Sequence, residues 1–116
     1  MATLDHSARV HAYFEAWNQH DQDKLKSNLS PHVKLTDWET SAVGINSVLQ
    51  ANATIWKAFP DIRITVVNIF NSQDSRVASC EINVDLNDGS STTLKVVDLL
   101  EFDSESKILE VRAYKQ

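Results

Sequence analysis

The chain has 116 residues, of which 42% are hydrophobic and 23% are charged, and these proportions are typical of a folded domain rather than a disordered chain. Sixteen Asp and Glu against eleven Lys and Arg give a net charge of −5, which argues against nucleic acid or an anionic membrane as a partner. The single cysteine, Cys80, excludes an internal disulfide and a cysteine-based zinc site. Because no apolar run has the ~18 residues of a membrane span and the N-terminus lacks a signal-peptide core, we expect one cytoplasmic domain over residues 1–116.

Two helices are expected in the first thirty residues. Over about Thr3–Gln19, apolar side chains recur at the spacing of an amphipathic helix, i, i+3, i+4 and i+7: Val10, Tyr13, Phe14 and Trp17. A second, short helix follows, with Asp21 as its N-cap and Pro31 just beyond its end. Leu25 and Leu29, one turn apart, would form the apolar side of this second helix.

An early strand and a third helix come next. His32–Trp38 alternates between apolar and polar positions, which places Asp37 on the apolar side of a strand and Trp38 on the opposite side. A helical stripe of apolar side chains then predicts a third helix over about Ile45–Phe59. Asn52 is the one polar residue within that stripe.

The second half of the chain predicts strands. Four segments are rich in β-branched residues or alternate in polarity: Asp61–Phe70, Arg76–Leu86, Thr92–Phe102 and Lys107–Tyr114. Residues 87–90, Asn-Asp-Gly-Ser, form a hairpin signal, because Asp-Gly supplies the positive φ of a tight turn. Helices followed by an antiparallel meander, with one early strand, indicate an α+β fold.

Three polar residues interrupt apolar faces. Asp98 lies in the middle of its strand, on the face that carries Val96 and Leu100. Burial there should raise the pKa of this carboxyl toward the neutral form, which can donate a hydrogen bond. Asp37 likewise lies on the apolar face of the early strand, near its end. Tyr13 lies in the apolar stripe of the first helix, and its hydroxyl needs a hydrogen-bond partner.

Structural alternatives stay open for these residues. Tyr13 could be a core filler, Asp37 could cap the turn that follows its strand, and Asp98 could be paired structurally. Asn52 could satisfy buried backbone groups or line a cavity. One shared cavity would join these four residues into a single site.

The other residues that could serve a catalytic or metal site show no pattern that indicates one. No metal or cofactor is expected, because the sequence has no Gly-rich phosphate loop, no Gly-x-Ser-x-Gly element and no zinc-binding histidine spacing. We expect the histidines at the surface or on helix flanks, and Cys80 packed as a small hydrophobe. Three tryptophans are expected mainly in the core, with some lining a ligand pocket: Trp17, Trp38 and Trp56.

Several segments resemble the NTF2-like superfamily, and within it the ketosteroid isomerase and SnoaL-like proteins. They are Ala12–Asp21, Leu29–Asp37, Phe59–Asp61 and Lys95–Asp103 with its continuation to Tyr114. The resemblance implies a cone, in which a curved antiparallel sheet wraps around a long N-terminal helix with two further helices. It also implies a deep pocket for a small hydrophobic ligand or substrate, and a homodimer formed through the outer face of the sheet.

The resemblance implies roles for the three polar residues. Asp37 matches the general base of ketosteroid isomerases, and Tyr13 and Asp98 match the pair that donates hydrogen bonds to the oxyanion. This implies a cofactor-independent isomerase that moves a double bond in a hydrophobic enone. We expect further contacts to the substrate from four residues: Asn52, Trp17, Trp56 and Lys115.

Two departures from the isomerases keep other functions open. Leu29 and Asn52 stand where some isomerases have tyrosines, and Lys115 stands where a pocket tryptophan is found. One alternative is a SnoaL-like polyketide cyclase, which should prefer an aromatic polyketide ester. Another is a non-catalytic module for ligand binding or dimerisation, in which Asp98 would titrate normally and Asp37 would face solvent. No Asp-Arg-Asp arrangement supports an epoxide hydrolase.

Overall fold

A computed structural model of the protein describes residues 6–116; the expected helix start at Thr3 lies outside them. Within that range the helices are α1 (Ser7–Asn18), α2 (Gln22–Ser27) and α3 (Ile45–Ala58). The strands are β1 (Leu29–Thr36), β2 (Ser41–Val43), β3 (Arg63–Asn71), β4 (Val77–Asp85), β5 (Thr93–Phe102) and β6 (Ile108–Lys115).

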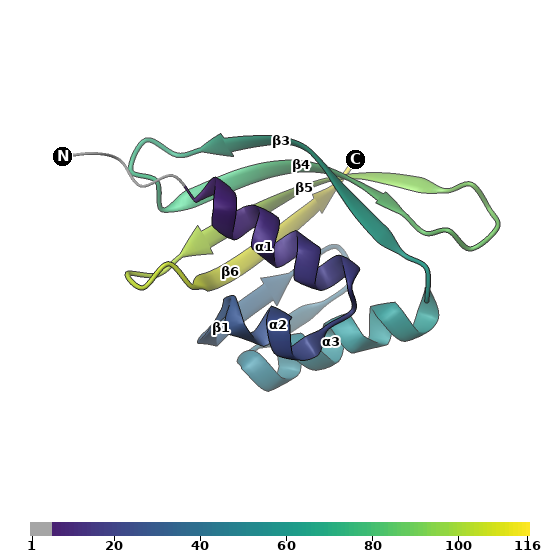
Figure 1. The fold of residues 1–116 in the computed structure, drawn as a ribbon, viewed down its shortest axis with the longest axis horizontal. Helices are drawn as coiled ribbons and strands as arrows, with labels where there is room; N and C mark the ends of the chain where they lie inside the picture. The colour runs from purple at the N-terminus through teal and green to yellow at the C-terminus, as the bar shows by residue number, and fades with distance from the viewer. Residues whose placement is uncertain (1–5) are drawn as a thin grey trace.

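The strands of the described residues form one six-stranded sheet in the order β2-β1-β6-β5-β4-β3. The sheet curves strongly, and α1 crosses its concave face while α2 and α3 lie beside β1 (Figure 1). The expected α+β cone is therefore confirmed. One pairing differs from an antiparallel sheet, because β1 runs parallel to β6. No hairpin joins these two strands, so no turn imposes an antiparallel direction on them.

The short second helix ends earlier than the sequence predicted. Asp21 is its N-cap as expected, and its side chain accepts a hydrogen bond from a backbone N–H of the first turn at 3.0 Å. Leu29 and Pro31, however, belong to β1 rather than to the helix and its end. The carbonyl of Asn28 accepts a hydrogen bond from the backbone of Ile108 at 2.9 Å, so the chain leaves the helix at Asn28 to pair with β6.

Strand β2 was not predicted. It has three residues, Ser41–Val43, and pairs antiparallel with the end of β1. Three residues are too few to show an alternating pattern in the sequence. Gly44 follows with φ +90°, a backbone conformation that favours glycine, and α3 begins at the next residue.

Apolar side chains fill the space between α1 and the sheet. On β4 the face that carries Ala78, Ile82 and Val84 is buried, and Cys80 on the same face is fully inaccessible to solvent, as expected of a small packed hydrophobe. The Asn18 side chain ties the end of α1 to β3, because it accepts from the backbone N–H of Ile64 at 2.7 Å and donates to its carbonyl at 2.8 Å. His6 is the N-cap of α1, on a helix flank as expected, but it is buried rather than at the surface, and its ring stacks on Phe102 at 4.0 Å.

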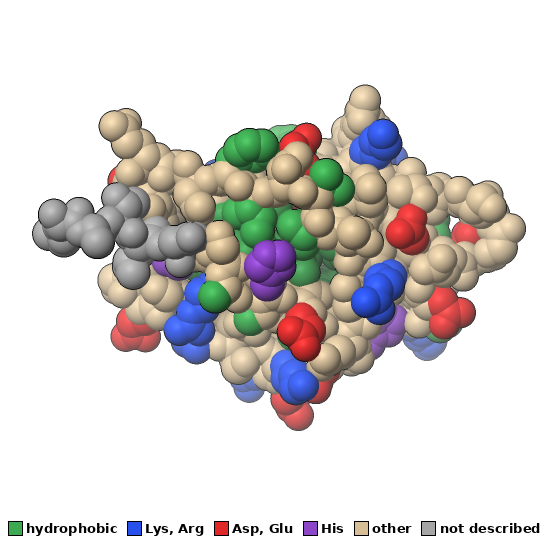
Figure 2. Space-filling view, turned by 45° about the horizontal axis from the view of Figure 1, so that its top comes forward, with side chains coloured by type: hydrophobic (Ala, Val, Ile, Leu, Met, Phe, Trp, Pro, Cys, Tyr) green, Lys and Arg blue, Asp and Glu red, His purple; other side chains and the backbone are tan. Residues whose placement is uncertain are grey.

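The outer surface carries mixed charge and some large apolar side chains. Acidic and basic side chains are interspersed on the face shown in Figure 2, and hydrophobic side chains gather in its middle. On the side of the sheet away from α1, Val67 and Tyr114 are more than half exposed. The homodimer through this face stays a prediction. Among residues 6–116, every helix is too short or too polar to cross a membrane.

Candidate active site

A cavity of about 330 Å³ lies between α1, α3 and the concave face of the sheet. This volume is at the small end of the range for ligand pockets, about 300–1,000 Å³. Most of its walls are apolar side chains of α3, of the strands and of the residues that adjoin them: Leu35, Ile55, Phe59, Ile62, Ile64, Ile82, Val84, Leu86, Leu94, Val96, Val111 and Ala113. The cavity therefore suits a compact ligand with an apolar body.

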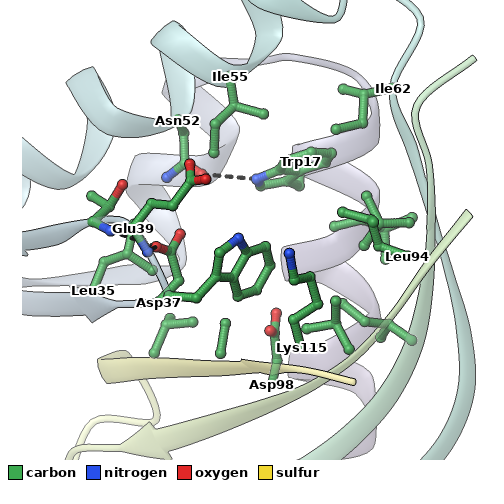
Figure 3. A pocket seen from close by; sticks show the side chains of 18 of the residues that line it. Trp17, Leu35, Asp37, Glu39, Asn52, Ile55, Ile62, Leu94, Asp98 and Lys115 are labelled. Atoms are coloured by element: carbon green, nitrogen blue, oxygen red, sulfur yellow. Dashed lines mark hydrogen bonds between the residues drawn. The ribbon is translucent and has the colours of Figure 1, made fainter. Parts of the chain in front are cut away.

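Six of the seven residues expected at the site line this cavity. They are Tyr13, Trp17, Asp37, Asn52, Asp98 and Lys115. Asp37, Asp98 and Lys115 reach into the same hollow from different elements (Figure 3). The exception is Trp56, which does not line the cavity. Trp56 instead stacks on His20 at 5.0 Å between ring centroids and meets the edge of Trp17 at 5.9 Å, because its position on α3 faces the end of α1.

Asp98 is a buried acid without a protein partner. Its neighbours across the sheet are Cys80 on β4 and Ala113 on β6, neither of which has a charged side chain. The Asp98 side chain is 7% exposed and has no hydrogen bond or ion pair among residues 6–116. Burial, and secondarily the negative charge of Asp37, raises the pKa of Asp98 to about 7. Below that pH the carboxyl is neutral and can donate a hydrogen bond.

Tyr13 is the second buried donor at the cavity. It is 5% exposed, and within the described part of the chain its hydroxyl has no hydrogen-bond partner. Burial raises the pKa of the Tyr13 phenol far above its usual value, and the Asp98 and Cys80 side chains add to this effect. The phenol therefore stays protonated, and its O–H is available to a ligand.

Asp37 lies immediately after β1, and a turn fixes its orientation. Its Oδ1 accepts hydrogen bonds from the backbone N–H groups of Glu39 at 2.8 Å and Thr40 at 2.6 Å. The capping role that the sequence left open is thus present. The same carboxyl is half-buried and lines the cavity. A carboxylate that is oriented by its backbone and faces an apolar cavity can serve as a general base.

Asn52 and Trp17 form a structural contact as well as part of the cavity wall. The Trp17 Nε1–H donates to Asn52 Oδ1 at 2.9 Å (Figure 3). The Asn52 amide then donates from Nδ2 to the carbonyl of Val48 at 3.0 Å. Both possibilities considered for Asn52 hold, because it satisfies a buried backbone group and lines the cavity.

Sequence reasoning missed the mouth of the cavity. Trp38, Glu39 and Thr40 line it, although strand alternation had placed Trp38 on the face opposite Asp37. Strand β1 ends at Thr36, and the turn at Asp37 breaks the alternation. Trp38 is 43% exposed rather than a core residue. Asp residues often accept hydrogen bonds from the backbone two or three residues further on and so form a turn. This property of Asp37 is the signal that could have placed residues 38–40 at the cavity.

The site combines one oriented carboxylate with two buried, protonated donors. This is the set of groups that proton transfer next to a carbonyl requires: a base, and donors for the negative charge that develops on oxygen. Asp98 is unpaired in residues 6–116 and its pKa is raised, which differs from the structural pairing considered for a non-catalytic module. In the same range, no group of three or more His, Cys, Asp or Glu side chains is placed to hold a metal.

Comparison with solved structures gives the same fold. The chain is similar to an NTF2-like protein of unknown function from Cytophaga hutchinsonii, with a TM-score of 0.79, 11% identity, and 99% of this chain and 93% of that one covered. It is similar to a provisionally assigned ketosteroid isomerase from Kribbella flavida, with a TM-score of 0.78, 20% identity and coverage of 94% and 76%. A provisionally assigned polyketide cyclase from Sinorhizobium meliloti has a TM-score of 0.78, 19% identity and coverage of 91% and 93%.

These identities are low, so the likeness to solved structures establishes the fold alone. None of the curated proteins matches the sequence. The family model of the SnoaL-like domain, by contrast, matches residues 10–111, a range that includes Tyr13, Asp37 and Asp98. The chain therefore belongs to the SnoaL-like domain family, and its fold is that of the NTF2-like protein.

Proposed function

We propose that this protein is a cofactor-independent isomerase that moves a double bond in a compact, hydrophobic enone. The observation that carries the proposal is that two acids in different environments, the buried Asp98 and the half-buried Asp37, line one cavity. Asp98 is neutral below about pH 7, whereas the carboxyl of Asp37 is oriented by two backbone N–H groups. One acid is thereby suited to donate a hydrogen bond and the other to accept a proton.

The reaction proceeds in two proton transfers. Asp37 removes a proton from the carbon between the carbonyl and the double bond, and the electron pair moves onto the carbonyl oxygen. The Tyr13 hydroxyl and the neutral Asp98 carboxyl donate hydrogen bonds to that oxygen, where the negative charge develops. Asp37 then returns the proton two carbons further along, which leaves the double bond conjugated with the carbonyl. No atom is gained or lost, so no co-reactant is needed.

A cyclase is the second candidate. The same acids could transfer protons during ring closure of a polyketide ester, and one protein of similar fold is provisionally assigned as a polyketide cyclase. The cavity favours the isomerase, because about 330 Å³ suits a ligand smaller than a multi-ring polyketide. The two candidates differ in substrate and not in the roles of Asp37, Tyr13 and Asp98.

The proposal is tested with a small β,γ-unsaturated ketone, 3-cyclohexenone, whose isomerisation gives a conjugated product that absorbs in the ultraviolet. We expect the purified protein to accelerate this change and Asp37→Asn to abolish most of the acceleration. Asp37→Asn keeps the Oδ1 acceptor of the turn, so its fold should be unchanged by circular dichroism. If the wild-type protein and Asp37→Asn isomerise the ketone equally, the proposal is wrong. Turnover of an aromatic polyketide ester in place of the enone would favour the cyclase.

A further inference from the structure

Lys115 is the only Lys or Arg among the described residues that line the cavity. The acids in that lining are Asp37, Glu39 and Asp98, yet none of them lies within ion-pair distance of Lys115; the ion pairs in residues 6–116 are those of Arg112 with Glu101 and Glu110. The Lys115 ammonium instead lies over the ring of Trp38, 5.2 Å from its centroid. An ammonium at a cavity mouth without an acidic partner is free to bind an anion.

The sheet fixes where this cation lies relative to the proposed reaction centre. Lys115 is paired with Val96 across β5 and β6, and Asp98 is paired with Ala113. Lys115 and Asp98 are therefore diagonal neighbours on the concave face, with Cβ atoms about 7 Å apart. The Lys115 side chain is exposed whereas that of Asp98 is buried, and both reach into the cavity (Figure 3).

None of the acids of the lining forms an ion pair with Lys115 in residues 6–116. Asp37 has one oxygen held by the turn, and Asp98 is neutral below about pH 7. Glu39 is exposed, so its carboxylate is solvated rather than paired with Lys115. The positive charge of Lys115 at the mouth is therefore not neutralised by an ion pair in the described residues.

We propose that Lys115 is a specificity-determining residue that binds a carboxylate of the substrate at the cavity mouth. The substrate would then be a compact apolar enone that carries a carboxylate several bonds from its carbonyl group. The carbonyl would lie at Tyr13 and Asp98, the apolar body along the strands, and the carboxylate at Lys115 beside the Trp38 ring. This inference rests on the proposed function for the position of the carbonyl.

The test compares a charged and a neutral form of one ligand, 3-(4-hydroxyphenyl)propanoate and its methyl ester. The phenol imitates the oxygen of the reaction intermediate, and the propanoate reaches toward the mouth. Binding is measured by calorimetry for the wild-type protein, for Lys115→Met and for the control Lys57→Met, whose lysine is exposed on α3. Methionine keeps the length of the side chain and removes its charge.

We expect the wild-type protein and Lys57→Met to bind the acid about fivefold more tightly than the ester, as for an exposed ion pair. Lys115→Met should lose that preference while its affinity for the ester is unchanged, and added salt should weaken binding of the acid only. An equal acid-to-ester ratio in wild-type and Lys115→Met protein, or tighter binding of the ester to wild type, would overturn the inference.

The failure of this inference is distinguishable from the failure of the proposed function. If wild-type and Lys115→Met proteins show the same acid-to-ester ratio, the carboxylate site is rejected, while isomerisation of neutral 3-cyclohexenone by the wild-type protein still tests the role of Asp37. Conversely, the wild-type protein could fail to isomerise the enone and still bind the acid more tightly than the ester through Lys115. That result would support the carboxylate site and contradict the proposed isomerase.

Discussion

Two buried polar clusters lie at the same cavity and differ in how their hydrogen bonds are satisfied. Between α1 and α3, the Trp17 indole, the Asn52 amide and the Val48 carbonyl form a closed chain of hydrogen bonds of 2.9 and 3.0 Å. At the concave face of the sheet, Tyr13 and Asp98 are as deeply buried, yet in residues 6–116 neither side chain has a hydrogen-bond partner.

The comparison separates structural polar groups from those available to a ligand. A buried polar group without a partner costs free energy, typically about 1–3 kcal/mol. The Trp17–Asn52 cluster avoids this cost within the protein, so its groups stabilise the fold. Tyr13 and Asp98 avoid it only when a ligand or water accepts their hydrogen bonds, which is the behaviour expected of an oxyanion site.

The largest expected effect is the loss of isomerase activity when the general base, Asp37, is replaced. Asp37→Asn should lower the rate of enone isomerisation about 10³-fold, because the amide cannot accept the substrate proton. Steady-state kinetics on 3-cyclohexenone measures this. The matched variant Asp37→Ala also loses the acceptor for the backbone of Glu39 and Thr40, so it should be less stable while Asp37→Asn is not. Activity retained in Asp37→Asn would remove Asp37 from the mechanism.

The second largest expected effect is a dependence of the unfolding free energy on pH, caused by Asp98. Its pKa is raised from 3.8 to about 7 in the folded protein, so the folded state binds the proton more tightly than the unfolded state. The stability from this group is complete below about pH 4 and is lost as pH rises to 7. The loss amounts to roughly 4 kcal/mol relative to Asp98→Asn, as measured by urea unfolding from pH 4 to 8.

A second variant, Asp98→Leu, tests whether the unpaired carboxyl of Asp98 destabilises the folded protein. Removing an unpaired polar group from an apolar face should leave the protein as stable as wild type, or more stable, above pH 7. A large loss of stability in Asp98→Leu would show that Asp98 belongs with the structural cluster. If the unfolding free energies of the wild-type protein and Asp98→Asn changed with pH in parallel, the raised pKa of Asp98 would be contradicted.

A smaller effect is expected from the closed cluster. Asn52→Leu removes the acceptor of the Trp17 N–H, which is then buried without a partner, and should cost about 2 kcal/mol of unfolding free energy. Chemical denaturation measures the cost. Near-wild-type stability of Asn52→Leu would mean that the two clusters do not differ as described.

The smallest effect is expected from Tyr13→Phe on stability. Since the Tyr13 hydroxyl has no partner in the described residues, its removal should change the unfolding free energy by less than about 0.5 kcal/mol. The same variant should isomerise the enone about 10²-fold more slowly. A destabilisation as large as that of Asn52→Leu would reveal a structural hydrogen bond of the tyrosine.

The sequence predicted the α+β class and the placement of Tyr13 and Asp98 on apolar faces because both follow from local periodicity, whereas the cone was implied by the family resemblance. Asp98 and Tyr13 interrupt regular apolar patterns in a strand and a helix, and each element forms as expected. Trp38 and Glu39 could not be assigned to the cavity, because strand alternation stops where the turn at Asp37 begins. Trp56 was misassigned, since a helical stripe does not tell which of its members face the cavity and which face another helix.

The unpredicted pairing of β1 with β6 has a similar cause. Strand pairing across the sheet is a long-range property, and the intervening β2 and α3 carry no pattern that specifies the partner of β1. The position of Lys115 at the mouth depends on the register of β6 with β5, which alternation alone does not provide.

The most direct test of the account is the ionisation of a naphthol bound in the cavity, followed by ultraviolet absorbance in wild-type, Tyr13→Phe and Asp98→Asn proteins. If Tyr13 and Asp98 both donate hydrogen bonds to a ligand oxygen, bound naphthol should ionise at a lower pH than free naphthol, and each variant should reduce that shift. Identical spectra and affinities in all three proteins would contradict the account, because the two side chains would then not meet at a ligand.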